Sequence, residues 1–348
     1  MPWYAFLLAP FALIFRVITD VRNWLFDRRV LNSYESPTPT LVVGNLNVGG
    51  TGKTPMVEFL LRNLRTEYQI AALSRGYGRK TKGFAQANSR SSAAEIGDEP
   101  LQIYQKFEGE IPVYVGEDRV AALDQIKQLA PQSQLVLLDD AFQHRRLRAD
   151  FYCLLTRHDR LFSRDFVLPM GRLRESRSGA SRADVVVVTK CPESLSPSER
   201  KEISQELKSY LKEGVPVIFS KISYGTPRSI EHVEPFSPNV ILVSGLADDR
   251  PFVSYCKGRF KVLEVLSFPD HYDYGDSEVS VLSRLLGDYR KENPVLLTTE
   301  KDAVKLKSLA NRGFLGEIPI FVMPIEAQFD SEDKHMLFNI IREKFSNK

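Results

Sequence analysis

The stretch NVGGTGKT, residues 47–54, constrains the fold and chemistry of this chain more than any other. Its end matches the pattern G-x-x-x-x-G-K-[ST], in which backbone N–H groups surround phosphate oxygens. Asn47 stands in place of the first glycine, a mild departure because asparagine tolerates the left-handed conformation better than most residues. We predict a nucleotide-binding loop formed by Asn47, Val48, Gly49, Gly50, Thr51, Gly52, Lys53 and Thr54.

The segments on both sides of this loop support the prediction. Residues 40–45 predict a short buried strand, and residues 53–64 predict a helix with one apolar face. A strand, a glycine-rich turn and a helix in this order are the context that such a loop requires, and the helix dipole favours anions at its start. Lys53 would reach the β- and γ-phosphates, and Thr54 would ligate Mg²⁺. The alternative is a plain glycine-rich turn with an exposed lysine.

Strands and helices alternate along most of the chain. Apolar runs without a polar alternation, such as residues 150–156 and 183–190, are typical of a parallel sheet covered on both faces. We predict a P-loop NTPase-like, doubly wound, mostly parallel α/β sheet, followed by a second, smaller α/β lobe. The expected parts are a membrane-associated helical segment at 1–28, a P-loop domain at 29–222, a proline-containing linker at 223–239 and a smaller domain at 240–348.

The N-terminal segment is unusually apolar. Its first fifteen residues carry no charge, yet they are fewer than the ~20 that a membrane-spanning helix needs. No lysine or arginine precedes the run, as a secretory signal would require. Trp3, Tyr4 and Trp24 prefer membrane interfaces, and nearby arginines suit anionic head groups. We predict one or two helices over residues 2–26, bent at Pro10 and lying in the membrane surface; the alternative is a helix packed on the protein's own core.

Three further places carry residues suited to metal binding or proton transfer. Asp139 and Asp140 end an apolar strand at the edge of the sheet where α/β folds bind ligands, although strand-end acids can also simply face water. Asp98, in GDEP, stands at a predicted helix start and could be either an N-cap or a functional acid. His271 lies among carboxylates, which suits proton transfer or an acidic turn. His144 follows the strand-end acids closely and could face the same cleft.

Seven motifs in this order resemble one known family, the tetraacyldisaccharide 4'-kinases, which are the lipid A 4'-kinases. They are VGNLNVGGTGKTP, LSRGYGRK, GDEP, DDAFQHRRLRAD, PMGRLRE, SFPDHYDY and TTEKDAVKL. The resemblance runs from the apolar N-terminus to at least Leu306, and the joint pattern is specific although no single motif is. The family's usual form of the fourth motif is DDGFQH, so Ala141 replaces a glycine here. The strand end should stay usable unless that glycine had a positive φ.

The resemblance implies a concrete activity. Such kinases transfer the γ-phosphate of ATP, with Mg²⁺, to the 4'-hydroxyl of an acylated glucosamine disaccharide 1-phosphate, which gives lipid IVA. They act as peripheral proteins at the cytoplasmic face of the inner membrane. The resemblance also places the catalytic base at Asp98, paired with His271. A carboxylate oriented by histidine can accept the proton of a sugar hydroxyl, and closure of the two lobes would assemble the pair. Lys53 would neutralise the transferring phosphoryl group.

The same resemblance suggests roles for the remaining motif residues. The implied metal ligands are Thr54, Asp139, Asp140 and Glu175. The residues implied to contact the anionic substrate are Tyr77, Arg119, His144 and Arg174.

Two other classes of function compete with this one. A regulatory P-loop switch would need a base-reading N-K-x-D or a second lysine before the loop, but residues 299–302 read TEKD and Val48 stands at the lysine position. A kinase for a soluble small molecule would not need the apolar N-terminus. The net charge of +3 indicates no particular partner, and we expect no nucleic acid. The oligomeric state, the nucleotide base and the acyl chains of the acceptor stay open.

Overall fold

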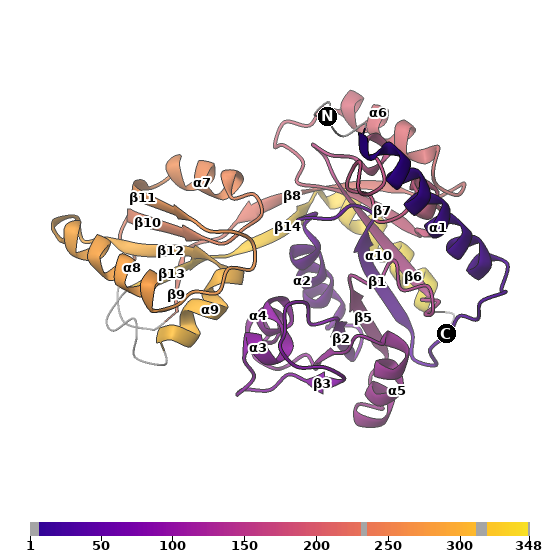
Figure 1. Cartoon of the computed structure of the whole chain (residues 1–348), viewed down its shortest axis with the longest axis horizontal. Helices are drawn as coiled ribbons and strands as arrows, with labels where there is room; N and C mark the ends of the chain where they lie inside the picture. The colour runs from indigo at the N-terminus through magenta and orange to yellow at the C-terminus, as the bar shows by residue number, and fades with distance from the viewer. Residues whose placement is uncertain (1–6, 231–234, 311–318, 347–348) are drawn as a thin grey trace.

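The computed structural model describes residues 7–230, 235–310 and 319–346 (Figure 1). Among them, nine strands form one sheet in the order β14-β8-β7-β6-β1-β5-β2-β4-β3. All neighbouring pairs are parallel except the two edge pairs, β14 with β8 and β3 with β4. The strands are β1 Thr40–Asn45, β2 Ile70–Ser74, β3 Ala85–Gln86, β4 Val113–Val115, β5 Leu135–Asp139, β6 Phe151–Arg157, β7 Val185–Thr189, β8 Val217–Tyr224 and β14 Ile325–Phe329.

Helices cover both faces of this sheet, as the apolar strands require. One core cluster joins alternate strand residues to α2 (Lys53–Leu64), α4 (Asp98–Lys106) and α10 (Ser331–Phe345). The other joins the opposite strand face to α5 (Arg119–Leu129) and α6 (Pro197–Lys208). The short α3 (Ala93–Ile96) precedes α4. The predicted doubly wound, mostly parallel fold is therefore confirmed.

The smaller lobe is a second α/β unit, at the left of Figure 1. Its sheet has the order β11-β10-β12-β13-β9, parallel apart from the β9–β13 pair. Apolar clusters lie on both of its faces. Its elements are β9 Arg228–Ser229, β10 Asn239–Ser244, α7 Arg250–Lys257, β11 Lys261–Ser267, α8 Asp276–Asp288, β12 Val295–Thr299, α9 Glu300–Ala310 and β13 Ile320–Met323.

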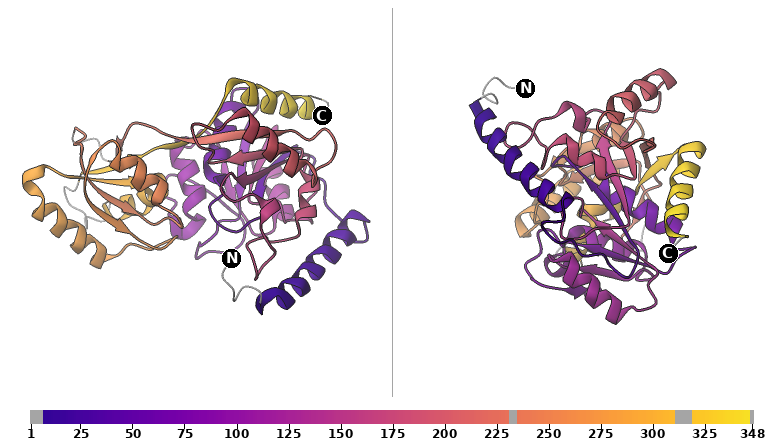
Figure 2. Two further views of the ribbon diagram at one scale, coloured as in Figure 1. Left: turned by 90° about the horizontal axis from the view of Figure 1, so that it is seen from above. Right: turned by 90° about the vertical axis from the view of Figure 1, so that its right-hand side faces the viewer.

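The chain crosses between the lobes twice, so two of the predicted boundaries are wrong. β8 leaves the large sheet and β14 returns to it as its antiparallel neighbour, and α10 then packs on the large lobe (Figures 1 and 2). Residues 325–345 therefore belong to the P-loop lobe and not to a domain running from 240 to 348. Part of the predicted linker 223–239 is strand as well, because β9 pairs with β13. Residues 231–234 of that linker lie outside the described residues.

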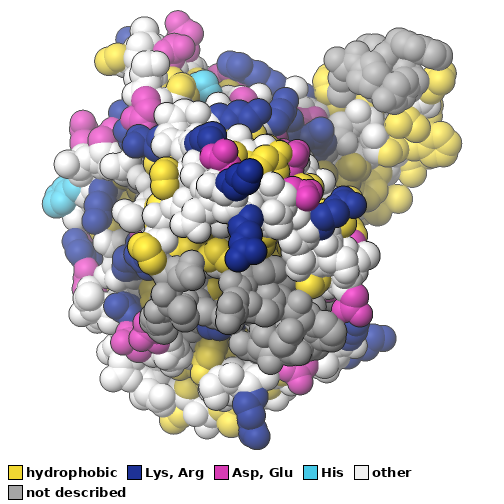
Figure 3. All heavy atoms as spheres, turned by 90° about the vertical axis from the view of Figure 1, so that its left-hand side faces the viewer, with side chains coloured by type: hydrophobic (Ala, Val, Ile, Leu, Met, Phe, Trp, Pro, Cys, Tyr) yellow, Lys and Arg dark blue, Asp and Glu magenta, His cyan; other side chains and the backbone are white. Residues whose placement is uncertain are grey.

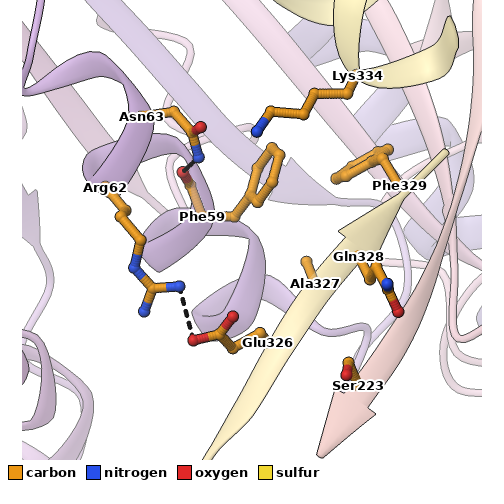
Figure 4. Close-up of a pocket in the computed structure, with 9 residues that line it drawn as sticks. All are labelled: Phe59, Arg62, Asn63, Ser223, Glu326, Ala327, Gln328, Phe329 and Lys334. Carbon is orange, nitrogen blue, oxygen red and sulfur yellow. Dashed lines mark hydrogen bonds and ion pairs between the residues drawn. The ribbon is translucent and has the colours of Figure 1, made fainter. Parts of the chain in front are cut away.

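A shallow pocket beside this two-stranded connection shows how β14 is fastened to the P-loop lobe (Figure 4). The ring of Phe59 on α2 lies 4.8 Å from the ring of Phe329 on β14. Arg62 on the same helix forms an ion pair of 2.7 Å with Glu326. The helix that follows the phosphate-binding loop thus also holds the strand that returns from the smaller lobe.

The N-terminal helix α1 runs uninterrupted from Ala9 to Asp27. Pro10 lies in its first turn, where its missing N–H is not needed, so the bend predicted at this residue is wrong. Trp3 and Tyr4 lie outside the described residues. Of the helices in the described part of the chain, none has the length and apolarity to cross a membrane. Figures 1 and 2 show α1 on the outer side of the P-loop lobe, away from the smaller lobe.

A charged triad around the buried Glu58 joins the two lobes. Lys106 Nζ on α4 lies 2.6 Å from Glu58 Oε2 on α2 and 2.8 Å from Glu300 on α9. Gln102 also donates to Glu58, and the carboxylate of Glu300 accepts from the N–H of Ile325 at 3.1 Å. Burial raises the pKa of Glu58 above its usual range, and the nearby charge of Lys106 opposes that rise. One lysine therefore pairs with a buried carboxylate on the P-loop lobe and a half-buried carboxylate on the smaller lobe.

We expect Lys106→Met to destabilise the protein by about 3–5 kcal/mol, because it leaves the buried carboxylate of Glu58 without its cation. The loss should be smaller at pH 5 than at pH 8, since without Lys106 the pKa of Glu58 rises further and the group takes up a proton. Urea unfolding at both pH values measures this. Lys127→Met, at an exposed position of α5, is the matched control and should change stability by less than about 0.5 kcal/mol. Equal stabilities of the two variants would contradict the role of the triad.

Candidate active site

Hydrogen bonds from neighbouring segments fix the conformation of the phosphate-binding loop. Gly52 has φ +80° and forms the N-cap of α2, so that Lys53 is the first helical residue. The N–H of Val48 donates to the carbonyl of Arg172 at 2.8 Å, which joins the loop to the segment that contains Arg172. Asn47 is buried, and its Nδ2 donates to Asp165 Oδ2 at 2.9 Å. The asparagine that departs from the usual glycine thus anchors the loop through its side chain.

Buried hydrogen bonds also fix the floor of the loop. Asn45 Nδ2 donates to the carbonyl of Asn47 and to Thr51 Oγ1, both at 2.7 Å. Thr189, at the end of β7, donates from Oγ1 to the carbonyl of Thr51 at 2.8 Å. The loop therefore has its shape before any ligand binds, which lowers the entropy cost of binding.

Asp139 fits the predicted metal role. It is almost fully buried at the end of β5, and its Oδ1 has no hydrogen-bond partner among the described residues. Burial raises the pKa of Asp139, the charge of Glu99 raises it further, and Lys53 opposes both. A buried carboxylate oxygen without a donor is the kind of atom that a divalent cation satisfies. The described residues hold no group of three or more His, Cys, Asp or Glu side chains placed to bind a metal, and Mg²⁺ commonly binds through one or two carboxylates and substrate phosphates.

Asp140 has a different setting. It accepts from two nitrogens of Arg174, at 2.8 and 3.1 Å, and lies 3.8 Å from Lys53 Nζ. Although burial acts in the opposite direction, Lys53 and Arg174 hold the pKa of Asp140 below its usual value. Asp140 is also the left-handed residue of this turn, with φ +51°, whereas Ala141 has no positive φ. Alanine in place of the family's glycine is therefore compatible with the turn.

Glu175 is surrounded by protein donors. Its oxygens accept from Asn23 Nδ2 at 2.6 Å, Gln143 Nε2 at 2.9 Å and Arg182 Nη2 at 2.6 Å. Because Asn23 belongs to α1, these bonds fasten the N-terminal helix to the P-loop lobe. This arrangement favours a structural role and gives no support to the predicted metal role.

The four predicted substrate contacts lie in different surroundings. Arg174 is paired with Asp140, as above. Arg119 is buried and donates to the carbonyl of Gly116 at 2.6 Å; burial lowers its pKa to about 10, and Asp139 opposes that shift. Burial and the charge of Arg119 lower the pKa of His144 to about 4, so His144 is neutral at pH 7. Tyr77 is 62% exposed, and its ring centroid lies 5.2 Å from that of His271.

Asp98 and His271 meet across the interface between the lobes. His271 Nδ1 lies 3.1 Å from Asp98 Oδ2, although the two residues are 173 positions apart. Gly97 is the N-cap of α4 and Asp98 is already helical, so the interpretation of Asp98 as an N-cap is wrong. Burial would raise the pKa of Asp98, but hydrogen bonds from His271 and Lys305 outweigh it and hold the pKa below the usual value. The pair is thus an ionised carboxylate in contact with an imidazole.

The sequence-based interpretation missed two lysines of α9. Lys305 Nζ lies 3.0 Å from Asp98 Oδ2, and Lys301 Nζ lies 3.3 Å from His271 Nε2. Both belong to the motif TTEKDAVKL, whose sequence pattern alone predicts no role for these side chains. The other missed neighbour is Glu99, whose charge acts on Asp139.

A preformed phosphate-binding loop, a lysine beside strand-end carboxylates and a doubly wound sheet define a nucleotide-dependent enzyme of the P-loop class. The family model described as tetraacyldisaccharide-1-P 4'-kinase matches residues 4–345. The chain belongs to the tetraacyldisaccharide 4'-kinase family.

Relatives of similar length agree with this assignment. The tetraacyldisaccharide 4'-kinase of Flavobacterium johnsoniae is 40% identical over 343 residues, covering 97% of this chain and 96% of the relative. That of Cytophaga hutchinsonii is 40% identical over 343 residues, covering 97% and 95%. The crystal structure of the "apo" form of LpxK from Aquifex aeolicus in complex with ATP superposes with a TM-score of 0.75 at 30% identity, covering 98% of this chain and 99% of that one.

The buried, neutral state of His144 predicts a pH dependence of stability. Its pKa of about 4 in the folded protein lies below the ordinary value of 6.5, so on acidification the unfolded chain takes up this proton first. Stability should therefore fall between pH 6.5 and 4, and His144→Gln should lose less stability over that range. Guanidinium unfolding at pH 7.5 and pH 5 measures the difference. His335→Gln, at an exposed position of α10, is the control; a wild-type pH slope in His144→Gln would show that the imidazole is not held neutral.

Proposed function

We propose that this chain transfers the γ-phosphate of ATP to the 4'-hydroxyl of a tetraacyldisaccharide 1-phosphate, which gives lipid IVA in lipid A biosynthesis. The observation that carries the proposal is the contact between Asp98 Oδ2 and His271 Nδ1, because a carboxylate beside an imidazole suits proton transfer from a hydroxyl acceptor in a P-loop chain of this family. The names of the relatives and the ATP bound to the Aquifex protein support the same reaction.

The P-loop lobe holds the phosphate donor. Backbone N–H groups of residues 48–54 surround the phosphates, and Lys53 places its charge on the β- and γ-phosphates. Thr54 and Asp139 would hold Mg²⁺, which neutralises charge on the phosphate oxygens when bound. Because Asp140 is already paired with Arg174 and lies close to Lys53, it positions that lysine and leaves Asp139 to the cation.

The base is assembled from both lobes. Asp98 accepts the proton of the 4'-hydroxyl while the hydroxyl oxygen bonds to the γ-phosphorus, and the bond from that phosphorus to the bridging oxygen of ADP breaks. His271 orients the carboxylate through the hydrogen bond at Oδ2. Since His271 belongs to the smaller lobe, the pair is complete only when the lobes are together. That requirement limits transfer to water when the acceptor is absent.

Purified protein, ATP labelled at the γ-phosphate and tetraacyldisaccharide 1-phosphate in detergent test this proposal. We expect Asp98→Ala to lower kcat by roughly 10²–10⁴-fold, the usual worth of general base catalysis, with little change in KM for ATP. His271→Ala should cost less, and the double variant should be little worse than Asp98→Ala, because both residues serve one proton transfer.

Lys53→Ala is the control for the nucleotide site, and it should lose roughly 10³-fold or more with the fold intact. Additive effects of the Asp98 and His271 variants on kcat, or lost melting temperature with retained kcat, would refute the pair. No labelled lipid from the wild-type protein would refute the reaction.

We further propose that α1 attaches the protein peripherally to the cytoplasmic face of the inner membrane. One side of the helix packs on the P-loop lobe through Ala12, Asn23 and Phe26. The opposite side exposes a set of large apolar side chains, each at least 51% exposed: Phe11, Leu13, Ile14, Val17, Ile18, Val21 and Trp24. Figure 3 shows hydrophobic side chains gathered on the element that projects at the upper right, where α1 lies. A helix with such a face, docked on its other side, suits a position in the plane of the interface.

The apolar face predicts the result of a binding experiment with vesicles. Replacing Phe11, Ile14 and Ile18 together by serine should weaken co-sedimentation with anionic vesicles at least ~100-fold, since each buried large apolar side chain contributes about 1.5–3 kcal/mol. Leu129→Ser, at an apolar position of α5 that is 58% exposed, is the matched control. KM for the lipid acceptor should rise more than KM for ATP. Unchanged vesicle binding of the triple variant would place the membrane contact elsewhere.

A further inference from the structure

Helix α9 carries a motif to which the proposed reaction assigns no role. In TTEKDAVKL, residues 298–306, four charged side chains each contact a different part of the site's framework. Glu300 pairs with Lys106 on α4. Asp302 is buried, accepts from the N–H of Gly245 and from the hydroxyl of Tyr274, each at 3.0 Å, and so organises the smaller lobe around the loop of His271. The remaining two charged residues, Lys301 and Lys305, contact the Asp98–His271 pair itself.

Lys305 holds one oxygen of Asp98. Its Nζ lies 3.0 Å from Asp98 Oδ2, the same oxygen that meets His271 Nδ1. Both of these contacts with the Asp98 carboxylate are made at Oδ2. Lys305 also donates to the carbonyl of Tyr272 at 2.8 Å, so it joins α9 to the loop that carries His271. With Oδ2 held by two donors, Oδ1 is the oxygen left to accept a proton.

Lys301 and Asp98 together favour one position for the hydrogen of His271, against Asp270, whose Oδ2 lies 3.9 Å from Nε2. Lys301 Nζ lies 3.3 Å from His271 Nε2, while Asp270 at 2.5 Å balances its charge. An ammonium group has donors and no acceptor, so Nε2 must offer its lone pair. The hydrogen of the neutral ring then lies on Nδ1, where it is donated to Asp98 Oδ2. The ring of the exposed Tyr77 also contacts the ring of His271.

We propose that Lys305 and Lys301 are positioning residues for phosphoryl transfer. Lys305 fixes Oδ2 of Asp98 so that Oδ1 accepts the proton of the acceptor hydroxyl, and Lys301 fixes His271 as the Nδ1–H tautomer that orients the same carboxylate. The inference deepens the proposed function and rests on it for the identity of the acceptor. Neither lysine touches the reacting atoms; both act through Asp98 and His271.

Kinetics over a range of pH test the role of Lys305. Lys305→Met should lower kcat about 10²-fold at pH 7.5, the effect expected when a reacting group is displaced by about 1 Å. It should also move the acidic limb of the kcat profile to higher pH, because the loss of a neighbouring cation raises the pKa of Asp98 and the base must be ionised to act. KM for ATP should stay unchanged.

Two further variants separate positioning from a merely structural role. Lys305→Arg keeps the cation and should bring the acidic limb back towards the wild-type position. Lys307→Met, at an exposed position of α9, should leave both kcat and the profile unchanged. A folded Lys305→Met protein with wild-type kcat, or one with reduced kcat and an unshifted acidic limb, would overturn the role of Lys305.

The role of Lys301 has a readout that does not depend on turnover. Nitrogen-15 NMR of labelled histidine, assigned by the signal lost in His271→Gln, reports which ring nitrogen is protonated. At pH 7.5 the wild type should show the Nδ1–H tautomer, and Lys301→Met should show a mixture of tautomers and a kcat reduced about 10-fold. An Nε2–H tautomer in the wild-type protein would overturn the inference. A wild type that shows the Nδ1–H tautomer but does not phosphorylate the lipid acceptor would refute the proposed reaction alone.

Discussion

The site depends on one oxygen atom, Oδ2 of Asp98, where three elements from two lobes converge. The carboxylate comes from the first residue of α4, the imidazole from the loop after β11, and an ammonium group from α9. A buried carboxylate in this position needs donors, since desolvation alone would favour its neutral form. The two donors come from the smaller lobe, so the ionised state that the proposed general base requires is a property of the assembled lobes. The Glu58–Lys106–Glu300 triad supports the same arrangement from the other end of α4.

The donor side of the site follows a different principle. Its shape comes from hydrogen bonds within the P-loop lobe, from Asn45 and Thr189 below the loop and from Asp165 beside it. A preformed loop binds phosphates at a lower entropy cost, so in the proposed reaction any movement of the lobes serves the acceptor side. This division suits an enzyme that must bind ATP without hydrolysing it. The P-loop lobe binds the donor and also carries Asp98, and the second lobe brings His271 and Lys305 to that carboxylate.

Local patterns in the sequence predicted the P-loop, the strand–helix alternation and the acidic strand end, because each is encoded within a few adjacent residues. Long-range partners were not visible. Asn47 looked like a tolerated replacement for glycine, whereas its side chain anchors the loop to Asp165, 118 positions away. Residues 325–329 resemble any short strand, and nothing local indicates that they return to the first sheet. Lys305 resembles an ordinary solvated helix lysine until α9 is seen against α4. The choice between cap and functional acid at Asp98 needed the backbone, which makes Gly97 the cap.

The attachment of α1 joins the proposed membrane surface to the phosphate-binding loop through buried polar contacts. Asn23 on α1 donates to Glu175, Gln143 donates to Glu175 and to the carbonyl of Asn45, and Asn45 supports the loop. Burying a charged side chain such as Glu175 is costly unless it is fully hydrogen-bonded. Its donors come from separate segments of the chain, so the hydrogen bonds hold those segments in fixed relative positions. An acceptor whose acyl chains remain in the bilayer presents its hydroxyl at a limited height above the surface. If α1 lies in the membrane surface as proposed, these contacts would hold the phosphate-binding loop at a fixed height above it, and Glu175, predicted to bind a metal, serves this joint through its three protein donors.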